Sequence, residues 1–301
     1  MVDRSVDFGA SDRPMSRSQL EQAGLVQFPT AVGGVVVFAN LPGIPSDKLR
    51  LDGAVLAAMY LGTVKEWNDP ALKALNPSLN LPALAITPVY RAEGSGTSFV
   101  LTNYLSKVSP AFKSAIGPTS TFTVAGGKGA KSTEENLRLV QGTPGAFGYS
   151  DYAFAIDTGL PTAQMKNQWG RFVVASIDSL QVAMRAANWE ILLIDQEPTF
   201  ELDLTDAGCP GCWPIASATY VLVPLKGRNG NSARVLDFFE QALQQGDESA
   251  NKKGYVPLPT RAKNIVSLAM RRWNASLDKS GAGRPQRRTE GDGLPTLLAS
   301  R

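Results

Sequence analysis

The chain has 301 residues, 43% of them hydrophobic, which suits a folded protein with a core large enough for two lobes. Its net charge of +3 comes from the stretch after Asp278, which holds five basic and two acidic residues; the remaining 25 basic and 25 acidic residues balance, so the body of the chain has no excess charge to attract nucleic acid or an anionic membrane. Histidine is absent, which excludes Ser-His-Asp and Cys-His catalytic sites and zinc sites that contain histidine.

Two long extended segments are expected, one at 28–40 (FPTAVGGVVVFAN) and one at 213–225 (WPIASATYVLVPL). Each starts with an aromatic residue and proline, has small residues at its centre and ends in β-branched residues, which favours strands. We interpret them as the two crossings between the lobes of a bilobal protein, with glycine and alanine giving room to bend. A chance similarity is the alternative.

Helices and strands are expected to alternate between these crossings. The expected elements are a helix near 51–60, a strand at 85–90, a helix after Ser95, a glycine-rich loop at 125–132, a helix at 133–140 and the stretch GAFGYSDY at 145–152. This alternation predicts the α/β class. Amphipathic helices are expected at 233–246 and 261–273. Residues 281–301 are polar, basic and aperiodic, and we interpret them as a disordered tail.

The stretch YRAEGSGTSFVLTNYL, residues 90–105, places a serine-rich and glycine-rich turn directly before a helical pattern. The first N–H groups of a helix have no carbonyl partners, and the helix dipole favours negative charge there. The hydroxyls of Ser95, Thr97 and Ser98 add donors, so the turn predicts an anion site with phosphate as the first candidate. An ordinary helix cap without a ligand is the alternative. The loop GGKG could also cradle phosphate, although a plain surface turn is favoured.

The two cysteines, Cys209 and Cys212, form a C-x-x-C pair that could be redox-active, half of a metal site or a structural disulfide. A redox pair should open a helix, whereas a β pattern follows here, and zinc would need two further ligands. A disulfide is therefore favoured, with reduced structural thiols as the alternative. No metal site and no cofactor are expected.

Several motifs together resemble one family. They are VDFGASDRPMS, QFPTAVGGVVVFANLPG, LDGAVLAAMYLGTVKEWNDPAL, YRAEGSGTSFVLTNYL, PGAFGYSDYAFA and WPIASATYVLV, in this order over residues 5–280. They look like the phosphate-binding proteins of bacterial high-affinity phosphate ABC transporters. The resemblance implies the α/β fold of a type II periplasmic binding protein, with two lobes joined by hinge strands. Lobe I is expected at 1–33 plus 218–280 and lobe II at 34–217.

The resemblance also implies the residues that hold phosphate. Arg91, Ser95, Gly96 and Thr97 would bind it from one lobe and Asp12 from the other. A carboxylate suits this position because hydrogen phosphate keeps a P–OH that it can donate to Asp12, whereas sulfate has none and would leave a buried carboxylate unpaired. Without the family, a helix cap or turn acid would be the preferred interpretation of Asp12.

The sequence departs from the family pattern in four places. Its opening strand, donor loops and export signal are missing before residue 5, so we expect an incomplete lobe I, arising from a wrongly assigned start or a gene fragment. Glu93 stands where many members carry aspartate. The cysteine pair lies in a variable segment, where a disulfide would fit an exported protein. The tail from residue 281 leaves the pattern.

The resemblance predicts a periplasmic, monomeric receptor that binds inorganic phosphate, delivers it to the ABC transporter permease and catalyses no reaction. Three rivals remain: a receptor for another oxyanion such as sulfate or molybdate, a phosphoryl-transfer enzyme that uses Ser95 or Thr97 as nucleophile, and a fragment that binds nothing. Asp12 argues against the first. The absence of histidine and of an acidic metal motif argues against the second.

Overall fold

A computed structural model describes residues 6–189, 199–225 and 231–279. The strands are β1 Gly9–Ser11, β2 Leu25–Ala39, β3 Arg50–Leu51, β4 Thr87–Arg91, β5 Lys128–Ala130, β6 Ala146–Asp151, β7 Gln164–Lys166, β8 Phe172–Val173, β9 Ala216–Pro224 and β10 Val256–Pro257. The α-helices are α1 Arg17–Ala23, α2 Gly53–Tyr60, α3 Pro70–Leu75, α4 Gly96–Val108, α5 Pro110–Ala115, α6 Thr133–Gln141, α7 Tyr152–Asp157, α8 Ile177–Ala186, α9 Ser232–Gln245, α10 Asp247–Lys252 and α11 Thr260–Lys279.

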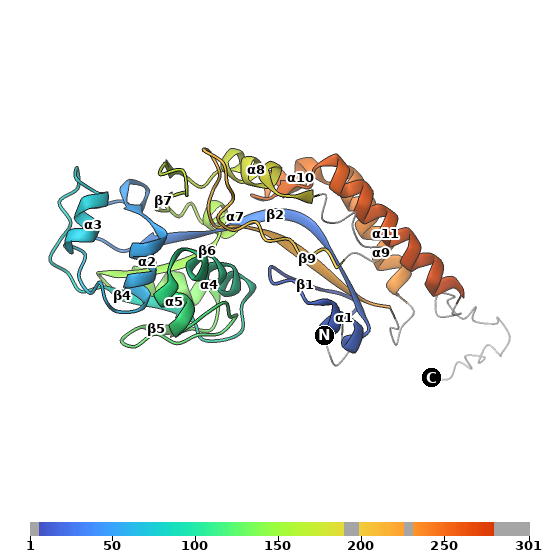
Figure 1. Ribbon diagram of the computed structural model, residues 1–301, viewed down its shortest axis with the longest axis horizontal. Coiled ribbons are helices and arrows are strands. Elements are labelled where there is room, and N and C mark those ends of the chain that lie inside the picture. The colour runs from blue at the N-terminus through green and yellow to red at the C-terminus, as the bar shows by residue number, and fades with distance from the viewer. Residues whose placement is uncertain (1–5, 190–198, 226–230, 280–301) are drawn as a thin grey trace, which may run out of the picture.

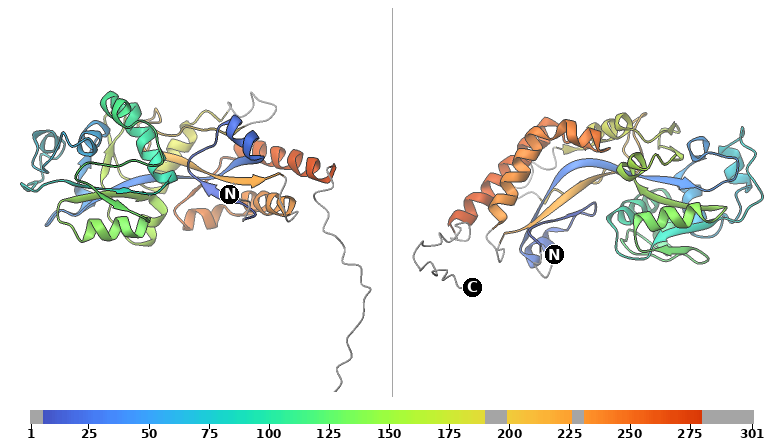
Figure 2. Two further views of the ribbon diagram at one scale, coloured as in Figure 1. Left: turned by 90° about the horizontal axis from the view of Figure 1, so that it is seen from below. Right: turned by 180° about the vertical axis from the view of Figure 1, so that it is seen from behind.

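The molecule is elongated and has two lobes (Figures 1 and 2). The first lobe contains β1, α1, α9 and α11, and the second contains β4 to β6 with helices α2 to α6. Strands β2 and β9 run through the middle and connect the two lobes, as the sequence predicted for the segments 28–40 and 213–225. The predicted limits of the lobes, at 33/34 and 217/218, stay a prediction.

The connecting strands belong to a sheet that, within the described residues, has the order β1-β9-β2-β6-β4-β5, with β10 also paired to β2. Strand β2 pairs antiparallel with β9 over its first part and with β6 over its last part. It is buried along most of its length, and helices α1, α4, α7 and α8 contact it, which agrees with its run of valines. One strand therefore carries the chain from the first lobe into the second.

Most of the expected local elements are confirmed. The helices expected at 51–60, after Ser95, at 133–140, at 233–246 and at 261–273 correspond to α2, α4, α6, α9 and α11. Side chains of Asp52, Ser95 and Ser132 cap α2, α4 and α6 by accepting a backbone N–H, which fixes where these helices begin. The predicted disordered tail at 281–301 lies outside the described residues.

The glycine-rich loop at 125–132 differs from the expectation of a plain surface turn. Only its first part is a turn, and Lys128–Ala130 forms the edge strand β5, which pairs in parallel with β4. A methyl group at Gly127 would lie 2.8 Å from the carbonyl oxygen of Pro88, so the glycine lets this strand approach β4 closely. Glycine here serves strand packing.

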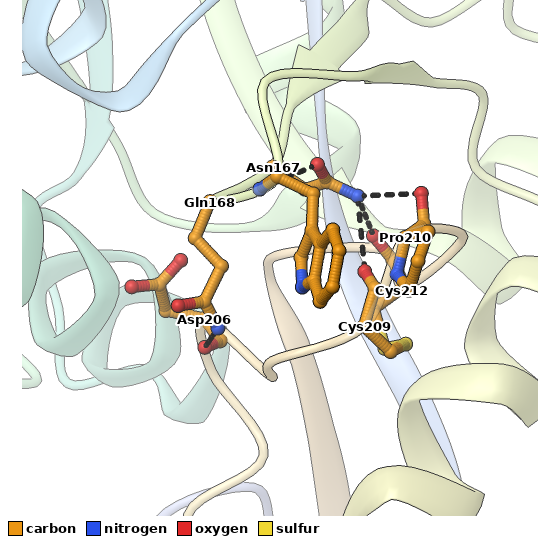
Figure 3. The surroundings of a disulfide bond; sticks show 7 residues. Asn167, Gln168, Asp206, Cys209, Pro210 and Cys212 are labelled. Atoms are coloured by element: carbon orange, nitrogen blue, oxygen red, sulfur yellow. Dashed lines mark hydrogen bonds between the residues drawn. A yellow bond between two sulfur atoms is a disulfide. The ribbon is translucent and has the colours of Figure 1, made fainter.

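The predicted disulfide between Cys209 and Cys212 is present (Figure 3). Asn167 stabilises the turn that the disulfide closes, since its side-chain Nδ2 donates to the carbonyls of Cys209, Pro210 and Cys212 at 3.3, 3.0 and 3.4 Å. The next residue, Trp213, is buried and donates its indole N–H to the carbonyl of Val35 in β2 at 2.9 Å. The disulfide turn thus lies directly before the second crossing and is joined to the first through Trp213.

No helix among the described residues is long and apolar enough to span a membrane. Within the same residues, no group of three or more histidine, cysteine, aspartate or glutamate side chains is placed to hold a metal ion.

Candidate functional site

Asp12 follows β1 in a tight turn beside the connecting strands. The hydroxyl of Ser11 accepts the backbone N–H of Arg13 at 3.0 Å and donates to the carbonyl of the same residue at 3.1 Å, which holds the turn. The Asp12 carboxylate accepts a hydrogen bond of 2.8 Å from the hydroxyl of Thr219, which belongs to β9. The acid is therefore fixed to a strand that connects the lobes.

The electrostatic surroundings of Asp12 disfavour its ionised form. Partial burial raises the pKa of the carboxyl, the hydrogen bond from Thr219 works against this, and the charge of Asp151 raises the pKa further. Sequence reasoning missed Thr219 and Asp151 as neighbours of Asp12, because both are distant in the chain. The sequence shows each of them only as a polar residue near a β pattern.

Opposite Asp12 lies the beginning of α4. Ser95 caps this helix by accepting the N–H of Ser98 at 3.3 Å, and its own N–H donates to the carbonyl of Ser120 at 3.0 Å. The helix has 13 residues, so its dipole is well developed, and no acidic residue in its first turn neutralises it. The helix start that the sequence predicted after Ser95 is present, and its binding of an anion stays a prediction.

Asp12 and the start of α4 touch each other at Gly96. A methyl group on Gly96 would lie 2.8 Å from the backbone nitrogen of Asp12 and 3.2 Å from its Cβ, so only glycine permits this approach. A cavity of about 460 Å³ opens between the two elements. Its wall includes Asp12, Arg13, Ser95, Gly96, Ser120 and Thr219. The structure thus brings together three of the residues predicted from the sequence, Asp12, Ser95 and Gly96.

Arg91 does not line this cavity. Its guanidinium donates to the carbonyl of Lys131 at 3.2 Å and to the hydroxyl of Thr133 at 3.4 Å, at the start of α6. Its Nε is buried and has no hydrogen-bond partner among the described residues. The predicted role of Arg91 in holding phosphate stays a prediction.

The other predicted residues of the turn differ in their surroundings. Thr97 is partly buried, Glu93 is exposed, and neither lines the cavity. Ser98 is fully buried, and its hydroxyl lies 2.6 Å from the hydroxyl of Tyr149, so its side chain faces the core of the second lobe. Ser98 therefore stabilises the turn, which differs from the hydroxyl donor that the sequence suggested.

The hydroxyl of Tyr149 contacts both ends of the segment 91–98 that contains the serine-rich turn. Besides contacting Ser98, its hydroxyl accepts the backbone N–H of Arg91 at 3.1 Å, so one side chain of β6 joins the end of β4 to the first turn of α4. Burial raises the pKa of this hydroxyl, while the bonds from Ser98 and Arg91 work in the other direction. Tyr149 holds the two ends of the 91–98 segment in place.

Replacing Tyr149 by Phe is expected to destabilise the protein by about 1 to 3 kcal/mol, because the buried hydroxyl of Ser98 then loses its partner. The change is measured as the free energy of unfolding in urea. Tyr60→Phe is the matched control, since the Tyr60 hydroxyl is buried and has no partner among the described residues. Its removal is expected to be neutral or stabilising. Equal losses in the two variants would contradict the assigned role of Tyr149.

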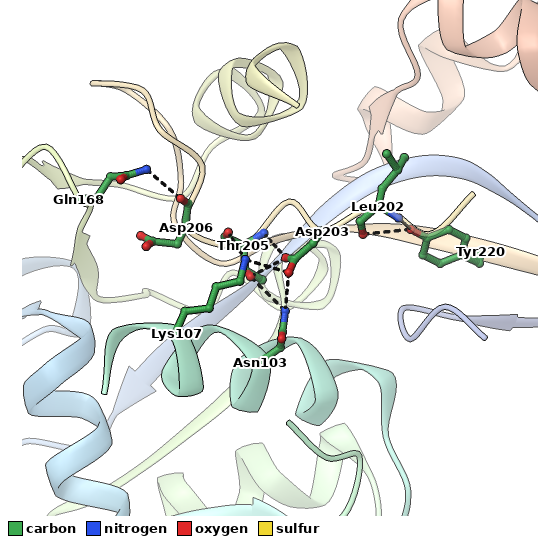
Figure 4. A network of polar contacts seen from close by, with 8 residues as sticks. All are labelled: Asn103, Lys107, Gln168, Leu202, Asp203, Thr205, Asp206 and Tyr220. Atoms are coloured by element: carbon green, nitrogen blue, oxygen red, sulfur yellow. Dashed lines mark hydrogen bonds and ion pairs between the residues drawn. The ribbon is translucent and has the colours of Figure 1, made fainter. Parts of the chain in front are cut away.

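The second half of α4 is anchored to the segment that leads toward β9 (Figure 4). Lys107 forms a 2.8 Å ion pair with Asp203 and donates to the carbonyl of Thr205 at 2.8 Å, while the amide of Asn103 donates to both residues. Burial opposes ionisation of Asp203, but the bonds from Lys107 and Thr205 outweigh it and lower the pKa of the carboxyl. The helix that presents the anion site is thus linked to the connection between the lobes.

Comparison with known proteins places this geometry in a family. Residues 1–227 match a family described as the PBP superfamily domain. The chain is also 39% identical over 270 residues to the phosphate-binding protein PstS of Xylella fastidiosa, an alignment that covers 89% of this chain and 72% of that protein. The chain belongs to the PstS family of phosphate-binding proteins. The PstS protein of Haemophilus influenzae is 37% identical over 278 residues, which cover 92% of this chain and 81% of that protein.

Solved structures support the fold of this PstS family member. A high-affinity periplasmic phosphate-binding protein with bound phosphate aligns over 87% of this chain and 78% of its own, with a TM-score of 0.66 and 19% identity. A phosphate-binding protein from Stenotrophomonas maltophilia aligns over 87% of this chain and 79% of its own, with a TM-score of 0.62 and 17% identity. The predicted family and the two-lobed α/β fold of a periplasmic binding protein are confirmed. PstS proteins are binding proteins, so the expectation that the chain is not an enzyme agrees with its family.

Proposed function

We propose that this chain is the phosphate receptor of an ABC phosphate importer. It binds hydrogen phosphate between the Asp12 turn of the first lobe and the start of α4 in the second, and delivers it to the permease as a periplasmic monomer. Membership in the PstS family supports this function. The observation that carries it is the contact between Asp12 and Gly96, which puts a carboxylate beside a helix start that attracts anions.

The two sides of the cavity suit different parts of hydrogen phosphate. The ionised oxygens match the N–H groups at the start of α4, and the hydroxyl of Ser95 in the cavity wall is a further donor. The P–OH group matches Asp12, because an ionised carboxylate can only accept hydrogen bonds. Hydrogen phosphate satisfies both sides at once.

Sulfate fits one side only. At neutral pH it is fully ionised and has no proton to donate, so it would place an oxygen lone pair against the lone pairs of Asp12. Leaving the second oxygen of this partly buried carboxylate without a donor costs about 1 to 3 kcal/mol, which is the physical basis for rejection of sulfate. This mechanism discriminates by penalising the wrong ligand, so it requires no difference in size between the two anions.

The proposed function is tested by isothermal titration calorimetry of the purified chain with inorganic phosphate and with sulfate at pH 7. Phosphate is expected to bind at least about a hundredfold more tightly than sulfate, which corresponds to nearly 3 kcal/mol. Absence of phosphate binding would overturn the proposed function. Equal affinity for the two anions would favour a general oxyanion receptor.

A further inference from the structure

Arg13, the residue directly after Asp12, reaches from the turn of the first lobe to the second lobe. Its guanidinium carbon lies 5.1 Å from the centre of the Phe99 ring, and its Nη1 donates to the hydroxyl of Ser120 at 3.4 Å. The Phe99 side chain belongs to the first part of α4, and the carbonyl of Ser120 holds the N–H of Ser95. One contact of Arg13 is therefore made with α4 itself, and the other with the residue whose carbonyl holds the cap of α4.

The same arginine lines the cavity, and among the described residues it is the one cationic side chain in the cavity wall. Asp12 is the one acidic side chain there. The negative charges of a bound anion and of Asp12 repel each other, and a nearby positive charge offsets this repulsion. The guanidinium of Arg91, which the sequence suggested for this purpose, is bonded to Lys131 and Thr133 outside the cavity wall.

We propose that Arg13 supplies the positive charge that faces the bound anion, and that its stacking on Phe99 ties the Asp12 turn to α4 when hydrogen phosphate is present. This inference rests on the proposed function and adds a residue to its site. The chemistry of arginine allows both roles at once: the flat face of the guanidinium packs on the ring while the N–H groups at its edge donate in the plane.

The hydrogen-bond inventory of Arg13 fits this role. A guanidinium carries five N–H donors, and within the described residues only the bond to Ser120 uses one of them. The side chain is exposed at the mouth of the cavity, so its remaining donors are reached by solvent and by an entering anion. Its charge is thus placed to attract the ligand during association as well as to hold it afterwards.

The test compares Arg13→Gln, which removes the charge, with Arg13→Lys, which keeps the charge and loses the flat stacking surface. Arg50→Gln is the matched control, because the Arg50 guanidinium carbon also lies 5.1 Å from the centre of an aromatic ring, that of Phe172, away from the cavity. Kd for inorganic phosphate is measured by calorimetry at pH 7. The association rate constant is measured by stopped flow at several salt concentrations.

Arg13→Gln is expected to raise Kd about tenfold or more and to flatten the salt dependence of the association rate. Arg13→Lys is expected to raise Kd less and to keep the salt dependence of the parent chain, whereas Arg50→Gln changes neither. A Kd for Arg13→Gln within about twofold of the parent, or a weaker Kd with an unchanged salt dependence, would overturn the inference. If the parent chain itself does not bind phosphate, the proposed function fails instead, so the two failures are distinct.

Discussion

Replacement of Asp12 by Asn is expected to remove most of the discrimination between phosphate and sulfate. With sulfate, the amide keeps its oxygen on the hydroxyl of Thr219 and donates an N–H to an ionised oxygen, so sulfate no longer faces an unpaired acceptor. With phosphate, the flipped amide accepts the P–OH, and its NH2 group donates to the Thr219 hydroxyl. We expect the ratio of the two affinities to fall from about a hundred or more to about ten or less. Competition calorimetry at pH 7 measures this ratio.

Asp151→Asn is the matched control for this substitution. Asp151 is a nearby carboxylate whose charge raises the pKa of Asp12, and its side chain caps α7 by accepting the N–H of Phe154 at 2.8 Å. Asparagine caps helices about as well as aspartate, so this variant changes a charge near the site without removing the acceptor itself. It is expected to keep the discrimination. If both variants lost the same amount of discrimination, the summed negative charge near the site, and not the acceptor at position 12, would exclude sulfate.

The pH dependence of thermal stability gives an independent measurement of the environment of Asp12. Because the folded protein raises the pKa of Asp12, ionising this group costs stability, and the cost grows as the pH rises through the raised pKa. Without ligand, Asp12→Asn is therefore expected to melt at a higher temperature than the parent chain at pH 7, and the difference should shrink toward acidic pH. A lower melting temperature at pH 7 would contradict the assigned environment of Asp12.

Gly96→Ala is expected to weaken phosphate binding by about tenfold to a hundredfold, the size of one lost hydrogen bond to a charged ligand. The added methyl group would lie 2.8 Å from the backbone nitrogen of Asp12, so the turn must move away from α4 and the donors and the acceptor no longer meet one anion. Alanine is a better helix former than glycine, so the helix itself should not suffer. Calorimetry with inorganic phosphate measures the loss.

Gly94→Ala is the control within the same turn. Its methyl group would find Thr121 Cγ2 at 3.9 Å as its nearest neighbour, which is ordinary van der Waals contact. We expect its Kd to stay within about twofold of the parent and the thermal stability of both glycine variants to stay close to the parent value. Unchanged phosphate binding by Gly96→Ala would mean that the contact between Asp12 and α4 does not form the site.

Much of the fold follows from local signals in the sequence. Ser95 predicts the beginning of α4 because a serine hydroxyl bonds a backbone N–H only three residues away, and the capping residues Asp52 and Ser132 act in the same way. The two long strands are recognisable because each combines an aromatic residue and proline at its start, small residues at its centre and β-branched residues at its end within a single segment. The beginning of α4 could therefore be predicted without coordinates, since all of its capping groups lie within a few residues of Ser95.

What the sequence determined by itself is this local chemistry: a helix start that attracts anions, an acid in a tight turn, two strands able to connect lobes and a cysteine pair close enough to bond. Only the tertiary structure decided the partners. It joined Asp12 to Thr219, turned the Ser98 hydroxyl toward Tyr149, bonded the Arg91 guanidinium to Thr133 and brought Arg13 across to Phe99. The physical reason is that these contacts join residues far apart in the chain. A pattern within a few neighbouring positions does not show which distant side chain the packing of the lobes brings close.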